Sequence, residues 1–315
     1  MYTIDIRPNM EIDMIINQEA DEIAYRVAFA CQKQAYIIDT GKTQRDLGPA
    51  LTKTRIVKAL AEKGRILDKD YQLGGYTVVE DENIVKHTLR MQIDKLTGLE
   101  HPELGKCSKL RLFLSPSDGS NFRNHIVTIP GPKGLGYKAK RPPKPHHLKF
   151  IRAYMRHHYD AVETKGYEAD DALSMYQTDT SVASHIDKDI SMVPGWHYDW
   201  VMREFYYVEK GLGRLELTDK NRLKRGGLIF FYAQMLMGDS TDNIPGIKRL
   251  GPVKAYKLLN AVETEQQAFD IVVEQYRNQY EDNWQVAIEE VADLLWMVRK
   301  DKLTGRQYLK EQGLI

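Results

Sequence analysis

The stretch that decides the fold is IDMIINQEADEIAYRVAFACQ, residues 12–32, in which a short apolar run passes directly into a helical pattern. Residues 12–17, IDMIIN, have the length and apolar content of a buried strand. In residues 22–32 the apolar side chains, including Ile23 and Val27, then recur at helical spacing. A buried strand followed at once by a helix is typical of α/β proteins, so this segment predicts the start of a parallel sheet.

Later segments of the sequence continue this alternation of strands and helices. Strands are expected at residues 110–114, 180–186 and 205–209, and helices at 82–97, at 147–158 and from Asp170 onward. From residue 221 the apolar spacing is mostly helical. We therefore predict an α/β fold over residues 1–220, with a mostly parallel central sheet and flanking helices, followed by a helical subdomain over residues 221–315.

Residues 33–80 do not fit the alternation. They are polar and are interrupted by Gly-Pro and Gly-Gly pairs, so only small helices around residues 54–63 are expected there. The sequence assigns no function to residues 33–105.

The composition is that of an ordinary globular protein. The 315 residues are 42% hydrophobic, which suffices for one large core or two modest ones. The 45 Lys and Arg nearly balance the 44 Asp and Glu, whereas a simple DNA-coating protein is usually much more basic. A nuclease remains compatible with this balance, because carboxylates at a metal site can offset a basic DNA-facing surface.

Cysteine usage and hydropathy favour a cytoplasmic protein without a membrane span. Cys31 and Cys107 are far apart and form no CxxC pair, so neither a disulfide framework nor a zinc site is expected. Residues 1–9 lack the apolar core of a signal peptide, and no apolar run approaches the roughly 20 residues that a membrane helix needs.

Carboxylates follow the predicted strands repeatedly. Glu19 and Asp21 follow the first strand, Asp118 follows the second, and Asp187 and Asp189 follow the third. Two further groups lie at helix or turn boundaries, and they are Glu168, Asp170 and Asp171 in YEADDAL and Asp239 and Asp242 in GDSTDNIPG. Because the carboxyl ends of parallel strands share one edge, these acids should converge there and repel one another. Mg²⁺ prefers oxygen ligands and relieves such repulsion, so the set fits a phosphodiesterase with two metal ions about 4 Å apart.

Each acid also has a purely local explanation. Asp is common in turns and at helix N-termini, so Asp170 could simply begin a helix and GDSTDN could be an ordinary turn. The prediction of a metal site depends on the ordered set.

Three motifs, YEADDAL, IDKDI and MGDSTDNIPGIKRLGPVKAYKLL, occur in this order and together resemble the 5′-nuclease superfamily. Its members include flap endonucleases, the 5′-exonuclease domain of bacterial DNA polymerase I and phage 5′–3′ exonucleases. The resemblance covers residues 12–32 and 110–260. It is greatest to the stand-alone phage enzymes, because the chain has no room for a polymerase, and host cytoplasm would then be its location.

The resemblance implies that the acids of these motifs hold two Mg²⁺ ions, for which Mn²⁺ can substitute. The residues concerned are Glu19, Asp118, Glu168, Asp170, Asp171, Asp187, Asp189, Asp239 and Asp242. At the N-terminal motif the family commonly has Asp where this chain has Glu19, and Asp21 is the alternative ligand nearby.

A basic loop at residues 130–149 contains YKAKR, which resembles the Y-K-x-x-R motif of the family. The resemblance implies that Lys138 and Arg141 lie over the scissile phosphate. A loop rich in Lys can attract phosphate and then position it, although such a run can also be a solvated linker. The DNA-binding residues expected here are Tyr137, Lys140 and Lys144.

The segment 238–260 resembles the helix–turn–helix variant with which the family grips duplex DNA. It implies DNA contacts from Gly246, Lys248, Arg249, Gly251 and Lys254, and a K⁺ ion bound by main-chain oxygens. A helix N-terminus there would present N–H groups to a phosphate. An ordinary helical hairpin capped by Gly is the alternative.

Taken together, these features predict a metal-dependent 5′–3′ exonuclease or flap endonuclease that hydrolyses DNA bearing a 5′ end, a nick or a flap. Two alternatives stay open at this stage. One is an RNase H-like enzyme that removes RNA from hybrids, and the other is a catalytically weak protein that binds DNA junctions.

Overall fold

The computed structural model describes residues 13–126, 136–139, 141–224 and 226–315. The chain forms two compact units, of which the first comprises Met1–Glu22, Asp94–Pro142 and Arg156–Ile315 and the second comprises Ile23–Ile93 and Pro143–Met155. Three of the four boundaries between them fall within helices α1 (Ala20–Ala30), α3 (Glu82–Thr97) and α4 (Leu148–His158), and the fourth lies between Pro142 and Pro143. The predicted functional division at residue 220 partitions the chain differently and stays a prediction.

The first unit is built on a mostly parallel sheet, as predicted, with the strand order β10-β9-β8-β1-β6-β5 and β7 beside β6. Its strands are β1 (Met14–Glu19), β5 (Glu100–His101), β6 (Gly105–Leu114), β7 (Val162–Glu163), β8 (Ser181–His185), β9 (Gly195–Asp199) and β10 (Glu204–Val208). The central strand β1 pairs in parallel with both β6 and β8, and β9 is parallel to β8. Only β5 and β10 run antiparallel to their neighbours in this sheet. The four strands predicted from sequence are β1, β6, β8 and β10.

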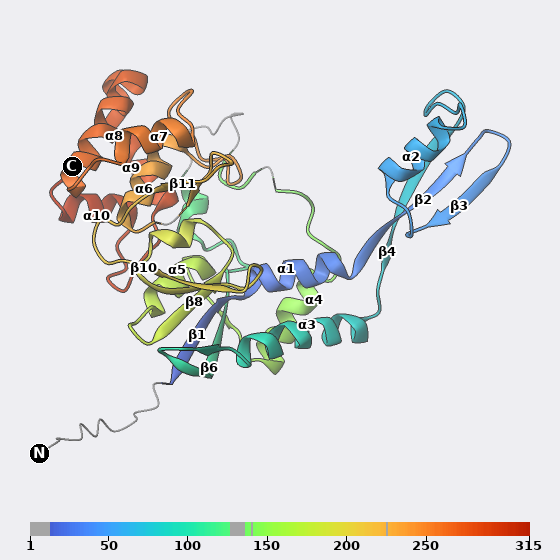
Figure 1. Cartoon of the computed structure of the whole chain (residues 1–315), viewed down its shortest axis with the longest axis horizontal. Helices are drawn as coiled ribbons and strands as arrows, with labels where there is room; N and C mark the ends of the chain where they lie inside the picture. The colour runs from blue at the N-terminus through green and yellow to red at the C-terminus, as the bar shows by residue number, and fades with distance from the viewer. Residues whose placement is uncertain (1–12, 127–135, 140, 225) are drawn as a thin grey trace, which may run out of the picture. The chain divides into compact units, whose positions relative to one another are not determined.

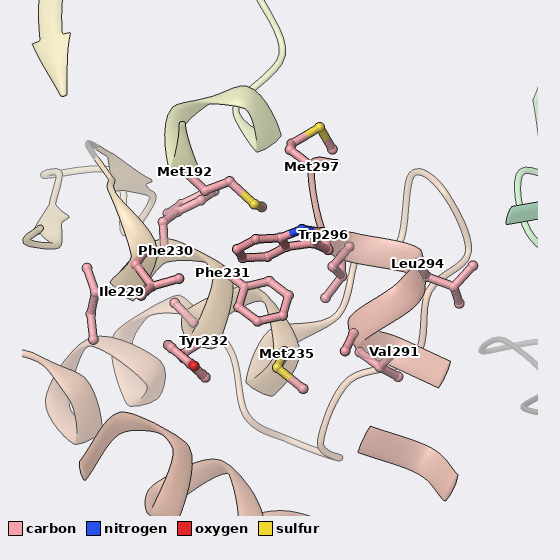
Figure 2. Close-up of a cluster of buried hydrophobic side chains, with 14 of the residues drawn as sticks. Met192, Ile229, Phe230, Phe231, Tyr232, Met235, Val291, Leu294, Trp296 and Met297 are labelled. Carbon is pink, nitrogen blue, oxygen red and sulfur yellow. The ribbon is translucent and has the colours of Figure 1, made fainter. Parts of the chain in front are cut away.

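Helices complete the first unit, and its C-terminal part is helical as predicted (Figure 1). They are α5 (Ala169–Tyr176), α6 (Leu228–Met237), α7 (Pro252–Leu259), α8 (Glu265–Tyr280), α9 (Trp284–Leu295) and α10 (Gly305–Glu311). Helix α6 is apolar on all sides and buried over nearly its whole length. Its Phe231 lies edge-on to Trp296, with ring centroids 5.0 Å apart, in the core drawn in Figure 2. Burial of large aromatic side chains therefore fixes the segment that leads into the acidic turn at Asp239.

The second unit contains an antiparallel sheet that the sequence did not predict. Strand β2 (Gln32–Asp39) pairs with both β3 (Gln44–Gly48) and β4 (Gln72–Val79) (Figure 1). Helix α2 (Lys53–Ala61) does lie where a small helix was expected. The strands were missed because most of their side chains are exposed or half-buried, so they lack the alternation of apolar and polar residues that marks a strand with one buried face.

Among the helices of the described residues, no stretch is both long enough and apolar enough to cross a membrane.

A buried histidine pair in the sheet makes the stability of the first unit depend on pH. The Nε2–H of His197 donates to the carbonyl oxygen of Val193 over 2.8 Å, and its Nδ1 lies 2.9 Å from His185 Nε2, which must be the donor. Burial lowers the pKa of His197 to about 4. Protonation of His197 at Nδ1 in the folded protein would place its new N–H against the N–H of His185 Nε2, and two donors repel each other.

We expect the free energy of unfolding to fall by about 3 kcal/mol through His197 as the pH drops from 6.5 to 4. The folded pKa lies below the unfolded one, so the unfolded chain takes up the proton first, and the stabilisation present above pH 6.5 is lost on acidification. Urea unfolding of the wild type and of His197→Gln at several pH values measures this, because their difference cancels other titrating groups. His157→Gln, at an exposed position, is the matched control. Parallel pH profiles for the wild type and His197→Gln would contradict the assignment.

Candidate active site

Two of the predicted strands, β1 and β8, bring acids to one edge of the sheet. Glu19 is the last residue of β1, and Asp187 follows β8 by two residues. Because β1 and β8 are adjacent and parallel, their carboxyl ends lie side by side. Asp170 lies in the first turn of α5, which contacts β1 and β8. The edge thus collects acids from three separate parts of the sequence.

Glu19, Asp170 and Asp187 are close enough to destabilise one another's negative charge. Burial, together with the neighbouring charges of Glu22, Asp170 and Asp187, raises the pKa of Glu19 well above its usual value. Burial and the charge of Asp187 do the same to the pKa of Asp170. Burial also raises the pKa of Asp187, with a further contribution from Asp242. The three carboxylates form an electrostatically strained cluster, which we call the acidic cluster.

The IDKDI and GDSTDN segments meet beside this cluster. Burial and the charge of Asp187 raise the pKa of Asp189, whose carboxylate accepts a hydrogen bond from Gln234. Asp239 lies 2.9 Å from the ammonium of Lys188. Although burial alone would raise the pKa of Asp239, Lys188 outweighs it and lowers that pKa. The two segments therefore approach each other as predicted, with a lysine between their carboxylates.

The YKAKR segment lies against the remaining acids. The Lys138 ammonium forms an ion pair with Glu168, and the Tyr137 hydroxyl donates to the same carboxylate over 2.8 Å. Arg141 lies 2.9 Å from Asp242, which Lys138 also approaches to 3.6 Å. Burial alone would raise the pKa of Glu168, but the charge of Lys138, aided by that of Arg123, lowers it to about 2. The structure thus brings Lys138 and Arg141, the predicted catalytic residues, against Glu168 and Asp242, two of the predicted metal ligands.

Asp171, also predicted to bind metal, is held by protein groups. It is fully buried and forms a bidentate ion pair with Arg123, over 2.6 and 2.9 Å. Its oxygens also accept the backbone N–H groups of Glu168 and Val298. Arg123 in turn donates to the carbonyl oxygens of Leu294 and Trp296. This hydrogen-bonded hub ties the start of α5 to the C-terminal part of the chain.

Asp118 lies apart from the acidic cluster. It is exposed, and hydrogen bonds from the Ser120 side chain and backbone N–H, with a smaller contribution from Lys165, lower its pKa. Asp21 likewise points elsewhere, since it accepts the backbone N–H of Ser115 over 2.7 Å. Glu19 also caps α1, through the N–H groups of Asp21 and Glu22.

Three residues near the site were missed in the sequence. Glu22 accepts the backbone N–H of Ile186 and the indole N–H of Trp200, and its charge raises the pKa of Glu19. Lys188 and Arg123 supply the positive charges described above. Glu22 is the third residue of the helix that Glu19 caps, and this capping spacing was the available signal.

The chemistry of the acidic cluster fits a hard divalent cation. Its donors are all carboxylate oxygens, and the raised pKa values reflect charge that a cation would stabilise. In the part of the chain that the structure describes, no group of three His, Cys, Asp or Glu side chains is arranged to hold a metal ion.

The segment 238–260, predicted to bind DNA, comprises the turn after α6 and helix α7. Lys248, Arg249 and Lys254 are exposed and line a shallow hollow together with Lys257. A Cβ atom at Gly246 would lie 2.1 Å from the backbone of Met237, so only glycine fits this close approach. Gly251 has open space around it and precedes α7, whose N-terminus it caps with its carbonyl. The hollow has the positive charge that a phosphate backbone requires.

The other predicted residues of the basic loop are less informative. Lys144 is exposed and belongs to the second unit, whereas Lys140 and residues 130–135 lie outside the described residues. His147 is buried and is hydrogen-bonded to the backbone carbonyl of Glu80 in the same unit.

Two curated proteins show the relationship of the chain. It is 27% identical over 207 residues to flap endonuclease Xni of Shewanella pealeana. The aligned region covers 58% of this chain and 74% of that protein. It is 25% identical over 205 residues to DNA polymerase I of Caldicellulosiruptor bescii, covering 56% of this chain but only 23% of the polymerase. No protein-family model matches the chain.

Solved structures of a T5 enzyme align over most of the chain. T5 5′-exonuclease with bound zinc covers 90% of this chain at 12% identity and a TM-score of 0.37, with 99% of that structure aligned. A T5 protein co-crystallised with metal ions also covers 90%, at 13% identity and a TM-score of 0.36, with 95% of that structure aligned. The sequence matches to the two curated proteins confirm the resemblance to the 5′-nuclease superfamily.

Proposed function

From this kinship with the 5′-nuclease superfamily, we propose that the chain is a divalent-metal-dependent nuclease that hydrolyses DNA phosphodiester bonds at or near a 5′ end. The observation that supports it best is the acidic cluster of Glu19, Asp170 and Asp187 beside Lys138 and Arg141. Carboxylates that repel one another next to paired cationic side chains suit a site for cations and a phosphodiester.

The acidic cluster would hold two Mg²⁺ or Mn²⁺ ions, with Asp189, Asp239 and Glu168 as further candidate ligands. When bound, such ions polarise a phosphoryl oxygen and lower the pKa of water. Glu168 and Asp239 are now engaged by Lys138 and Lys188, so these two carboxylates would have to exchange a lysine for a cation. Asp118 and Asp171 are weaker candidates for metal ligands. The carboxylate of Asp118 is hydrogen-bonded to Ser120, and that of Asp171 is paired with Arg123.

The basic side chains have separate tasks in this proposal. Lys138 and Arg141 would stabilise the charge that develops on the scissile phosphate, because both approach Asp242, whose charge acts on Asp187 of the acidic cluster. Lys248, Arg249 and Lys254 would grip the duplex backbone through the hollow beside α7. A K⁺ ion at this hairpin stays a prediction.

Digestion of 5′-labelled duplex, nicked and flap DNA, with Mg²⁺ and with EDTA, tests the proposal. Cleavage that starts at or near the labelled end and requires Mg²⁺ is expected. Matched RNA–DNA hybrids show whether RNA is the preferred strand. Binding to all DNA forms with no cleavage in Mg²⁺ or Mn²⁺ would instead identify a DNA-binding protein.

The Lys138→Ala variant should lower the single-turnover cleavage rate by about 10²-fold, the scale for losing one preorganised electrostatic group. Equilibrium DNA binding should fall much less, because many other phosphate contacts remain. Lys144→Ala is the control from the same loop, and its effect should be mainly on affinity and should shrink at high salt. The deciding measurement is the single-turnover cleavage rate of each variant at saturating enzyme. If the two variants lost equally little cleavage rate, Lys138 would only attract DNA to the site and would have no catalytic role.

A further inference from the structure

Helix α2 and the turn after it carry basic side chains that the proposed active site does not use. Lys53, Arg55, Lys58 and Lys63, which we call the α2 basic cluster, are all exposed. The segment from Lys53 to Arg65, KTRIVKALAEKGR, contains five basic residues and one acid, although the whole chain has a net charge of only +1. Positive charge is therefore concentrated on this part of the second unit.

The cluster faces solvent because the apolar side of α2 points the other way. Ile56 is buried and Val57 and Leu60 are half-buried, whereas Arg55 and Lys58 are exposed one helical turn apart. Thr52 caps the N-terminus of the helix by accepting the N–H of Arg55, so the position at which the helix begins is defined.

Three acids of the same unit, Asp39, Asp46 and Asp70, are hydrogen-bonded to groups outside the cluster. Asp39 accepts hydrogen bonds from Gly41 N–H and Gln44, and Asp46 accepts from Gly48 N–H and Tyr76. Asp70 accepts the N–H of Ile66. Within the described residues, no ion pair involves a side chain of the α2 basic cluster. Its four charges are therefore available to an anionic partner.

We propose that the α2 basic cluster is a second contact site for the phosphate backbone of duplex DNA. The proposal rests on the proposed nuclease function for the nature of the polyanion. The segment from Lys53 to Arg65 has no aromatic side chain on which an unpaired base could stack, so its positive charges are assigned to backbone phosphates. The cluster lies in the second unit and the hollow beside α7 in the first, so the two add separate terms to affinity.

The test compares two triple variants that remove equal charge. Arg55→Gln, Lys58→Gln and Lys63→Gln are combined in the first, and Lys220→Gln, Arg222→Gln and Lys302→Gln, all exposed, are combined in the matched control. Gln has nearly the helix propensity of Lys and Arg, so α2 is retained, and circular dichroism checks this. Anisotropy with a labelled duplex in EDTA is measured from about 50 to 200 mM salt, and the slope of log K against log salt is compared.

The α2 triple variant should lose about tenfold or more in affinity at low salt, and its slope should flatten by roughly 2 to 3, at about 0.9 per lost phosphate contact. Single-turnover cleavage at saturating enzyme should match that of the wild type. The proposal would be overturned if the α2 triple variant had the same salt slope as the control variant, or if both variants lost the same affinity for the duplex. Wild type that binds duplex but does not cut it would refute the nuclease function alone, whereas the slopes would still decide this contact site.

Discussion

The Asp170→Asn variant is expected to cleave DNA about 10³-fold more slowly, or not at all, while the metal-free protein becomes more stable. Asp170 lies in the acidic cluster, where burial and the charge of Asp187 disfavour its ionised form. Asn keeps the shape of the side chain but removes a charge that repels Asp187 and Glu168. The variant therefore relieves a strain in the folded protein and at the same time removes a charge on which the proposed metal site depends.

Two measurements made on the same protein sample check the Asp170 prediction. Urea unfolding in EDTA gives the gain in stability, and single-turnover cleavage across a range of Mn²⁺ concentrations gives the loss of activity. Asp179→Asn is the matched control, because Asp179 is exposed and forms only a surface ion pair with Lys210. If Asp170→Asn retained more than about a tenth of the wild-type rate, the loss would be below the scale of a single electrostatic group, and the metal assignment would be withdrawn.

The parallel sheet was predictable because its central strands are short apolar runs followed by helices. Met14 and Ile16 of IDMIIN and Leu112 and Leu114 of LRLFL are buried, and the apolar composition of the two runs identifies them as strands. The sheet of β2, β3 and β4 was not predictable in this way. Hydrogen bonding between strands holds it together, while Gly74 and Gly75 interrupt the apolar side chains of β4, and such pairing leaves little trace in sequence.

The motifs of the candidate site could be predicted from the sequence, but the ion pairs and hydrogen bonds between its side chains could not. Strand order brings Glu19 and Asp187 to one edge, and adjacency in a parallel sheet suffices to infer this. Which carboxylate bears a free charge depends on side chains that are distant in sequence. Arg123 lies 48 residues from Asp171, and no periodic pattern links the two. A motif therefore predicted Asp171 and Asp170 as equivalent ligands, although their surroundings differ completely.

The Arg123→Met variant is expected to lower the free energy of unfolding by about 3 to 5 kcal/mol, the usual cost of leaving one partner of a buried ion pair unpaired. Arg123 is 1% exposed and Asp171 is fully buried, so water cannot solvate the carboxylate that remains. Arg123 also donates to the carbonyl oxygens of Leu294 and Trp296, and these acceptors would be left unsatisfied. Urea unfolding at neutral pH measures the loss.

A double-mutant cycle with Asp171→Asn separates a structural role for this carboxylate from metal binding. If Asp171 mainly orders α5, both single variants destabilise the protein, and the double variant loses less than the sum of the two because the pair is removed together. If Asp171 is instead a metal ligand, Asp171→Asn weakens Mn²⁺ binding, measured by calorimetry, with stability in EDTA nearly unchanged. The bidentate pair and the two backbone N–H donors already occupy its oxygens, which favours the first outcome. Asp171 would then hold its neighbours Glu168 and Asp170 in place, and the C-terminal part of the chain, through Leu294, Trp296 and Val298, would support the acidic cluster.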